Sequence, residues 1–237
     1  MDNSSYTILT RQSGLARELQ VVANNIANSA TTGFRSEGMI FSEYVQGVEH
    51  GQSLSMGMGN VHNTDFAQGA LTQTGGSFDF GIEGDGYFLI ETPLGERLTR
   101  AGAFAANAEG ELVTNDGFRV LDAGGAPIFV PADAGPLSVS SDGTFSVGGA
   151  PIARLGIVQP NAPLDMVRED GVMFRADAGF EQAQDARVVH GFTEGSNVNA
   201  VGQLSRMIEV QRAYELGQSF LESEDERMRT ALKSLSQ

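Results

Sequence analysis

The chain has 237 residues with 15 basic and 30 acidic side chains, a formal net charge of −15, and no cysteine. This acidity gives it no electrostatic attraction to nucleic acid or anionic lipid, and the missing cysteine excludes disulfides, thiolate metal sites and cysteine nucleophiles. Apolar residues make up 41% of the chain. That is enough apolar surface for a hydrophobic core, so the chain is not an acidic disordered tail.

The N-terminal residues, MDNSSY, contain no basic segment followed by an apolar one. The longest apolar runs, such as YFLI at residues 87–90, are far shorter than the roughly 20 residues that span a membrane. We therefore expect no cleavable secretory signal and no membrane insertion.

A first helix is predicted over residues 5–28. Its apolar residues Leu15, Leu19, Val22 and Ile26 are spaced four, three and four apart, which is the seam of a coiled coil rather than the wider stripe of a globular surface helix. Gln12 interrupts this seam. The spacing therefore predicts a helix that pairs with another helix.

Three asparagines, Asn24, Asn25 and Asn28, lie near the end of this helix. Asparagine is a poor residue for the middle of a helix, because its amide competes for backbone hydrogen bonds. One interpretation is that these residues end the helix. The other is that a buried amide in the seam disfavours wrong alignments of the paired helices.

The central part of the chain is predicted to be β-rich. Residues 34–77 contain many Gly, Ser, Thr and Asn residues with little periodicity and are predicted to form an extended connector. From residue 78 to 196, turn dipeptides such as Asp85-Gly86 and Asp116-Gly117 recur between short runs typical of strands. Those runs are residues 87–91, 97–99, 111–113, 118–121, 127–130, 137–139 and 153–158. This spacing predicts an antiparallel β-domain.

A second, longer helix is predicted over residues 197–237. Residues 195–197 supply a helix-start signal with a capping side chain. A seven-residue repeat then runs through Ala200, Met207, Tyr214, Leu221, Met228 and Leu235, with Leu204 at a partner position. The fold class is therefore predicted to be α+β, with paired N- and C-terminal coiled-coil helices and a central antiparallel β-domain. Two ordinary helices lying on the β-domain are the alternative.

The sequence shows no pattern typical of a catalytic or metal site. The three histidines, His50, His62 and His190, lack the spacing of a zinc site, and the glycine-rich residues 81–86 lead into a strand without a phosphate-binding lysine. Glu83 with Asp85, or Glu109 with Glu111, could in principle form a pair of catalytic carboxylates, but a chain with 30 acidic residues contains such neighbours by chance. We expect no enzyme activity, cofactor or metal.

Three segments resemble one known family, the rod and hook proteins of the bacterial flagellar basal body. They are ANNIANSATTGFR (residues 23–35), GDGYFLI with LTRAGAF in the middle of the chain (residues 84–90 and 98–104), and SNVN with MIEVQRAYE near its end (residues 196–199 and 207–215). They follow the family's order and cover both ends and the middle. Within the family, the compact size and short connector resemble the proximal rod type, and the distal rod type is the alternative.

The resemblance implies a structural subunit of the flagellar basal-body rod. In this family both termini join in a helical domain that packs into a hollow drive shaft across the periplasm, with the β-domain outside. The subunits are exported by the flagellar type III apparatus without a cleavable signal. The implied partners are other rod subunits and possibly copies of this chain. The expected domains are residues 1–33 with 197–237 (rod core), 34–77 (connector) and 78–196 (outer β-domain).

The resemblance and the two seams place the expected assembly interface on the terminal helices. Its residues are Leu15, Leu19, Val22, Asn24, Asn25, Ile26, Asn28, Leu204, Met207, Gln211, Tyr214 and Leu221. Residues 1–35 carry a net charge of +1 and residues 197–237 a net charge of −1, so the whole imbalance of −15 lies in residues 36–196. Near-neutral ends suit the close packing of many copies, because a net charge there would repel itself.

Two functions of other classes remain as alternatives. A periplasmic peptidoglycan hydrolase would use a carboxylate pair of the β-domain. A surface adhesin would not require its terminal helices for motility. A wall-turbidity assay tests the first, and deletion of the last thirty residues followed by a swimming assay tests the second.

Overall fold

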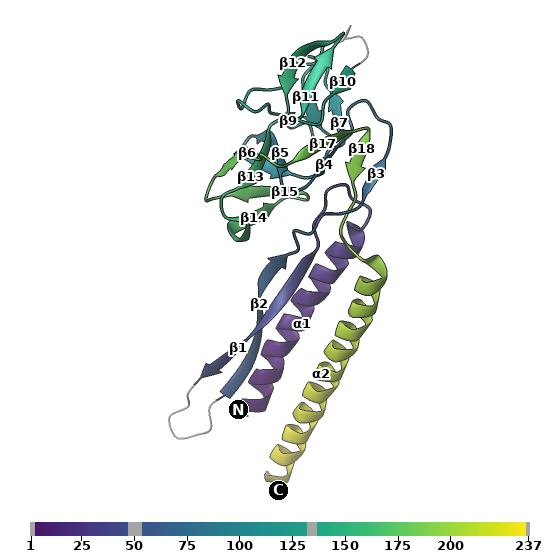
Figure 1. Cartoon of the computed structure of the whole chain (residues 1–237). Helices are drawn as coiled ribbons and strands as arrows, with labels where there is room; N and C mark the ends of the chain where they lie inside the picture. The colour runs from purple at the N-terminus through teal and green to yellow at the C-terminus, as the bar shows by residue number, and fades with distance from the viewer. Residues whose placement is uncertain (1–2, 47–53, 132–136, 236–237) are drawn as a thin grey trace. The chain divides into compact units, whose positions relative to one another are not determined.

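The computed structural model describes residues 3–46, 54–131 and 137–235 (Figure 1). A helix stands near each end of the chain, α1 (Asn3–Ala27) and α2 (Ala200–Leu235), with antiparallel strands between them. The predicted α+β class, with terminal helices and a central antiparallel β region, is therefore confirmed. The chain divides into two compact units. The helical unit contains Met1–Ser29, Ser36–Phe66 and Val198–Gln237, and the β unit contains Ala30–Arg35 and Ala67–Asn197.

The helical unit contains a β-hairpin beside its two helices. Strand β1 (Glu37–Gln46) pairs antiparallel with β2 (Leu54–Thr64), and α1 packs against both the hairpin and α2 (Figure 1). The structure differs here from the expected extended connector over residues 34–77. In β2, Leu54, Met56 and Met58 do alternate with small residues, a two-residue period that indicates a strand, but the alternation breaks after them at Asn60 and Val61.

The start of α2 also differs in detail from the expectation. Asn199, rather than Asn197, caps the helix, because its Oδ1 accepts a hydrogen bond from the Gly202 amide at 3.0 Å. The side chain of Asn197 instead donates to the carbonyl oxygen of Ala67 at 3.0 Å within the β unit.

The β unit is built almost entirely of short antiparallel strands. Its largest sheet has the order β14-β15-β6-β5-β9-β8-β7, with β13 joined to β5 and β16 joined to β13. Smaller sheets are β10-β11-β12, β17-β4 and β18-β3. The strands are β3 (Leu71–Gln73), β4 (Phe80–Glu83), β5 (Tyr87–Thr92), β6 (Gly95–Thr99), β7 (Phe104–Ala106), β8 (Leu112–Thr114), β9 (Arg119–Val120), β10 (Leu137–Val139), β11 (Thr144–Val147), β12 (Ala150–Arg154), β13 (Ile157–Pro160), β14 (Met166–Glu169), β15 (Met173–Ala176), β16 (Phe180–Gln182), β17 (Arg187–His190) and β18 (Phe192–Glu194), with a short 3-10 helix, η1 (Pro163–Asp165).

Most of the predicted strands are confirmed, with two exceptions. Residues 127–130 form only isolated bridges, and residues 153–158 are divided between β12 and β13. The division falls at Gly156, where a Cβ atom would lie 2.6 Å from the carbonyl oxygen of Asp122. The close approach of a second backbone therefore interrupts the strand there.

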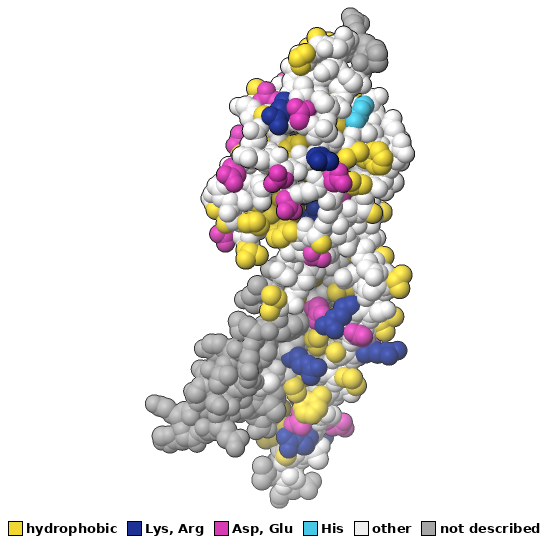
Figure 2. Space-filling view, in the orientation of Figure 1, with side chains coloured by type: hydrophobic (Ala, Val, Ile, Leu, Met, Phe, Trp, Pro, Cys, Tyr) yellow, Lys and Arg dark blue, Asp and Glu magenta, His cyan; other side chains and the backbone are white. Residues whose placement is uncertain are grey.

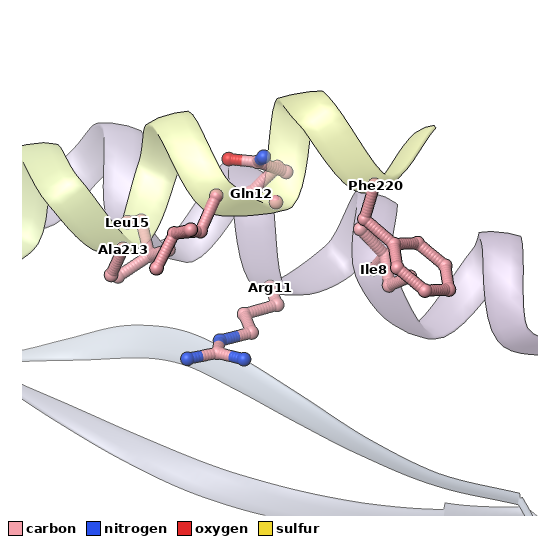
Figure 3. Close-up of a pocket in the computed structure, with 8 residues that line it drawn as sticks. Ile8, Arg11, Gln12, Leu15, Ala213 and Phe220 are labelled. Atoms are coloured by element: carbon pink, nitrogen blue, oxygen red, sulfur yellow. The ribbon is translucent and has the colours of Figure 1, made fainter. Parts of the chain in front are cut away.

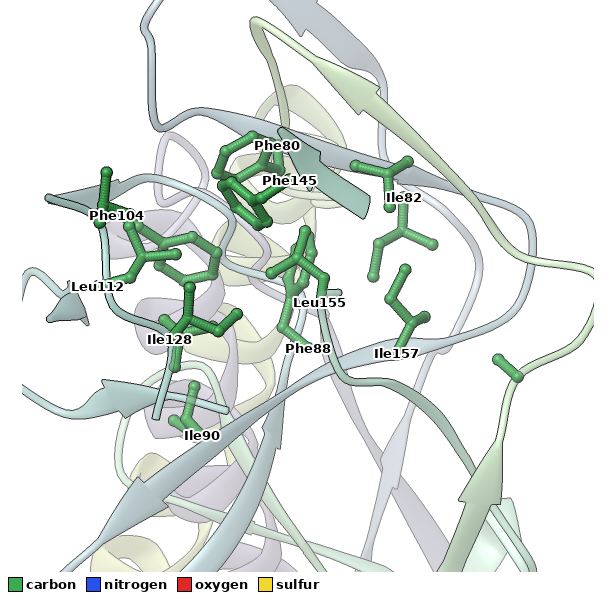
Figure 4. Close-up of a cluster of buried hydrophobic side chains, with 14 residues drawn as sticks. Phe80, Ile82, Phe88, Ile90, Phe104, Leu112, Ile128, Phe145, Leu155 and Ile157 are labelled. Carbon is green, nitrogen blue, oxygen red and sulfur yellow. The ribbon is translucent and has the colours of Figure 1, made fainter. Parts of the chain in front are cut away.

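The hydrophobic core of the β unit is a cluster of fully buried side chains from many strands (Figure 4). Phe80 packs edge-on against Phe145 with ring centroids 5.2 Å apart, and Phe88 packs edge-on against Phe104 at the same separation. Edge-to-face packing of this kind adds to the stabilisation gained from burying the rings. The β unit therefore has a core of its own.

Candidate assembly interface of the terminal helices

Helices α1 and α2 run antiparallel, side by side (Figure 1). Among the described residues of α2, Val210 is the only one that is fully buried, at 2% exposed. Along α1, by contrast, Gln12, Leu15, Glu18, Val21, Val22 and Asn25 are all buried. Because α1 is covered by both α2 and the hairpin, it buries more positions than a single seam would.

Asn25 is fully buried and joins three elements of the helical unit. Its Nδ2 donates to the carbonyl oxygen of Glu37 at 2.7 Å, and its Oδ1 accepts from the Glu37 amide at 2.9 Å. Its Nδ2 also lies 3.4 Å from Oε1 of Gln203 on α2. Asn28 instead bonds to Asn24 one turn earlier, at 2.8 Å between the side chains. Of the three asparagines, Asn25 is thus the one with the buried, aligning position.

Gln12 fills a gap that a glycine leaves in α2. Its Nε2 donates to the carbonyl oxygen of Tyr214 at 2.8 Å. A Cβ atom added at Gly217 would lie 2.3 Å from the same Nε2. The glycine therefore makes room for the amide, and an interruption of the sequence pattern becomes a point that fixes the two helices axially.

A third polar contact joins the helices at Glu18. This carboxylate is 8% exposed and pairs with the guanidinium of Arg206, Nη2 to Oε1, at 2.5 Å. Arg206 also reaches Glu209 on its own helix at 3.2 Å. The hydrogen bond to Glu18 raises the pKa of Arg206, so its guanidinium remains charged.

The predicted interface residues fall into three groups. Leu15, Val22 and Asn25 are buried inside the helical unit; Leu19, Ile26, Asn28, Met207, Tyr214 and Leu221 are half-buried; Asn24, Leu204 and Gln211 are exposed. From Met207 to Leu221, the seven-residue repeat of α2 therefore lies toward the unit's own interior, whereas Met228 is 41% exposed. The sequence pattern missed the buried positions Glu18 and Val21, since both lie outside the predicted seam of α1.

A second apolar row follows the outside of α2. Leu204, Ile208, Leu216 and Phe220, which we call the outer row, are 50%, 51%, 73% and 44% exposed and lie at four-residue steps, with Arg212 between the two pairs. Side chains four residues apart form the ridges by which helices pack into each other's grooves. Figure 2 shows hydrophobic side chains interspersed with basic ones on the visible face of the helical unit. Monomeric proteins rarely leave such rows uncovered.

The outer row leads to a hollow of about 300 Å³ between the two helices (Figure 3). Its walls are mainly apolar and come from Ile8, Arg11, Gln12, Leu15, Ala213, Leu216, Gly217 and Phe220. Close-packed interiors contain few voids of this size, so the hollow is a place where another side chain can enter.

Glu111, one of the carboxylates considered for catalysis, lies in a set of polar contacts on the β unit. Glu111 is bound by Arg119, Nε to Oε2 at 3.1 Å, and by the Asn107 amide. The described residues contain no group of three metal-ligating side chains, and among them no helix is long and apolar enough to cross a membrane. His190 contacts the carbonyl oxygen of Ser77 at 3.0 Å, and His50 lies outside the described residues.

Three family descriptions match the chain in order. They are "Flagella basal body rod protein" over residues 6–35, "Flagellar hook protein FlgE/F/G D1 domain" over residues 81–147 and "Flagellar basal body rod FlgEFG protein C-terminal" over residues 189–234. The chain is therefore built from segments that flagellar rod and hook proteins share.

Relatives extend this match over nearly the whole chain. A FlgF rod protein of Caulobacter vibrioides is 36% identical over 99% of this chain and 98% of its own. A FlgF of Rhizobium meliloti is 38% identical over 91% and 90%, and a FlgG of Bacillus subtilis is 30% identical over 95% and 96%. The chain belongs to the flagellar basal-body rod protein family, and it is similar to the FlgF type. The resemblance predicted from the sequence is confirmed.

Proposed function

We propose that this chain is a non-enzymatic subunit of the proximal rod, part of the hollow drive shaft that transmits torque across the periplasm and lets exported subunits pass. Three family segments in the right order, spanning both ends and the middle of the chain, carry this proposal. Three FlgF relatives support the proximal position over the distal one, since their identities of 36 to 38% exceed the 30% and 33% of two FlgG relatives, whereas a FlgF of Escherichia coli is 29% identical.

The terminal helices are the part proposed to bind other rod subunits and possibly copies of this chain. Leu15, Val22 and Asn25 would hold the two helices together, and we propose that the helices pair as a coiled coil. The exposed residues Leu204, Gln211 and Asn24, with the outer row, would contact neighbours. Burying one large apolar side chain contributes roughly 1.5–3 kcal/mol, so a polymer gains considerable cohesion from each row it covers.

The subunit is proposed to reach the basal body through the flagellar export apparatus, without a cleavable signal. The near-neutral charge of both terminal segments supports their role as the packing part. The acidic residues 36–196 would contribute mainly to the solvated part.

A pair of matched substitutions tests the proposed surface. Leu216, 73% exposed on α2, and Leu94, 79% exposed at the turn between β5 and β6, are each changed to Asp. In cells that lack the native chain, Leu216→Asp is expected to abolish swimming and to be missing from purified basal bodies. Leu94→Asp is expected to assemble normally. Circular dichroism of both purified variants checks that each is folded. Normal incorporation of folded Leu216→Asp would refute the proposed interface.

The proximal and distal positions are distinguished by the rod itself. Cells that lack this chain are expected to stop rod assembly before the distal segment is added. Electron microscopy of their basal bodies measures how much rod persists. A rod that lacks only its outermost segment would instead favour the distal position.

A further inference from the structure

The β unit buries a carboxylate between two guanidinium groups. Glu194 Oε1 lies 2.5 Å from Arg35 Nη1, and Glu194 Oε2 lies 2.9 Å from Arg100 Nη1. The three side chains are 0%, 3% and 0% exposed for Arg35, Arg100 and Glu194. We call these residues the junction cluster. Burying charged side chains costs free energy unless they are paired and hydrogen-bonded. Three buried charges at one place therefore indicate a role besides stability.

The cluster also binds backbone groups that only charged or polar side chains can hold. Glu194 Oε1 accepts a hydrogen bond from the Gly69 amide at 2.8 Å, and Arg35 Nη1 donates to the carbonyl oxygen of Ala67 at 2.7 Å. Arg100 Nη2 donates to the carbonyl oxygen of Gly84 at 2.7 Å. Well-packed apolar residues could match the stability of such a cluster, but they could not fix these backbone groups.

Two of those backbone groups, at Ala67 and Gly69, lie where the chain passes from one unit to the other. The chain makes four such passages, after residues 29, 35, 66 and 197. Arg35, Ala67 and Asn197 are the β-unit residues directly at three of them. The Asn197 side chain donates to Ala67 at 3.0 Å, and its amide lies 3.3 Å from the carbonyl oxygen of Phe34. On the β unit, these passages are therefore within hydrogen-bonding distance of one another.

Contacts on both sides hold the segment that carries Arg35. Gly33 has a φ of +70°, and a Cβ atom there would lie 2.3 Å from the amide nitrogen of Ala101. Its own amide donates to the carbonyl oxygen of Glu194 at 2.8 Å. Arg168 lies over the ring of Phe34, 4.6 Å from its centroid, and donates to the carbonyl oxygen of Arg35 at 2.5 Å. Cation–π contact and hydrogen bonding thus add to the ion pairs.

The cluster has more donors than acceptors. Arg35 Nε, Arg35 Nη2 and Arg100 Nε are buried without a hydrogen-bond partner among the described atoms. Two guanidiniums share the single carboxylate of Glu194, so the loss of that charge leaves both unpaired. The ion pairs of the cluster therefore depend on one side chain, Glu194.

We propose that the junction cluster is a mechanical clamp, which holds the chain passages together on the β unit when force acts on the subunit. This inference rests on the proposed function, since a rod subunit is one on which torque acts. Force that pulls residues 30–35, 67–69 and 194–197 apart must break buried, charge-assisted hydrogen bonds before the β core unfolds.

Hydrogen exchange on the purified full chain tests whether the clamp exists. Glu194→Gln keeps the shape of the side chain and removes its charge. Well below the unfolding temperature, it is expected to speed exchange of the Gly33, Gly69 and Asn197 amides by about 10- to 100-fold. Exchange of the core amide of Leu89 is expected to stay unchanged. The matched control is Leu112→Ala, which removes a side chain of the core cluster that is likewise 0% exposed.

Leu112→Ala is expected to speed exchange in the core without a selective effect at the junction. Unchanged exchange at the junction amides of Glu194→Gln, or an equal rise everywhere, would overturn the proposal. If Glu194→Gln does not fold, Asn197→Ala serves instead, because it removes the side-chain bond to Ala67 and leaves the three charged residues in place. It is expected to speed exchange at Gly69, and unchanged exchange there counts against the clamp.

Swimming in media of rising viscosity tests the response to force. Glu194→Gln cells are expected to stop at a lower viscosity than Leu112→Ala cells whose subunit has a matched thermal midpoint. Equal behaviour of the two variants would show that the cluster has no mechanical role. If cells without the whole chain still build complete rods, the proposed function is wrong. The hydrogen-exchange experiment on the purified chain still tests the clamp, because it does not depend on rod assembly.

Discussion

The β unit and the helical unit use their apolar side chains in different ways. The β unit surrounds Phe80, Phe88 and Phe145 completely, and each of these rings is 0% exposed. The helical unit fixes its α1–α2 contact largely with polar side chains and leaves the outer row of α2 uncovered. The β unit thus completes its own core, whereas the helical unit leaves an apolar surface on α2 that another molecule can cover.

Core and outer-row substitutions provide the strongest test of this difference. Phe80→Ala is expected to lower the free energy of unfolding of the β unit by about 3–5 kcal/mol, because it leaves a cavity in a closed core. Leu216→Ala on α2 is expected to change stability by no more than about 0.5 kcal/mol. Urea unfolding followed by circular dichroism measures both. Similar losses for the two variants would mean that Leu216 is already buried in the free chain.

A double-mutant cycle at Gln12 and Gly217 tests the fit between the helices. Gly217→Ala alone is expected to break the hydrogen bond of Gln12, because the new Cβ atom would clash with the Gln12 side-chain amide. This loss is expected to cancel the stability gained from the better helix preference of alanine. In a Gln12→Ala background the same change should stabilise α2 by about 1 kcal/mol, the helix preference of alanine over glycine. A coupling of about 1–2 kcal/mol is expected from thermal unfolding. Additive effects would show that the two residues do not meet.

The ion pair at Glu18 is expected to contribute less. Glu18→Gln should lower stability by about 1 kcal/mol, because Arg206 is half exposed to water and the pair is partly screened. Glu209→Gln, which removes the more exposed partner of the same arginine, is the control and should cost under about 0.5 kcal/mol. Thermal unfolding followed by the helical circular dichroism signal measures both losses. A larger loss for Glu209→Gln than for Glu18→Gln would refute the role given to the Glu18–Arg206 pair.

The smallest effect concerns acid stability of the β unit. Hydrogen bonds from Arg97, with the charge of Arg175, hold the pKa of Glu169 below its ordinary value of 4.5. A carboxylate with a lowered folded pKa stabilises the fold above its unfolded pKa, and this contribution is lost as the pH falls through the folded value. The thermal midpoint of Glu169→Gln should therefore fall less steeply below about pH 4.5 than that of the native chain. Glu181→Gln, an exposed carboxylate on β16, is the control and should follow the native slope.

Local patterns in the sequence predict most of this architecture. The spacing of Leu15 and Val22 indicates α1, and Asp116-Gly117 marks a real turn, with Gly117 at a φ of +85°. The outer row is also readable in the sequence, but the stronger seven-residue repeat of Met207 and Tyr214 hides it. A repeat shows which residues share a face, and it does not show which partner covers that face.

The features that the sequence could not predict depend on distant residues. Arg100 and Glu194 are 94 positions apart and meet only when β6 and β18 are both in place. Gln12 reads as a defect in the seam until Gly217 is seen opposite it. In both cases a residue that looks unfavourable on its own becomes favourable through a partner that spacing does not reveal.

The contact between Ala67 and Asn197 has a consequence for how such chains can change. An inserted module is tolerated when its entry and exit points lie close together, because the host then needs no new spacing. Residues 67–197 belong to the β unit, and the two ends of this stretch are joined by a hydrogen bond of 3.0 Å from the Asn197 side chain to the carbonyl oxygen of Ala67. The segment between them is therefore an exchangeable cassette: loops within it can lengthen, shorten or be replaced while the distance between its two ends stays the same.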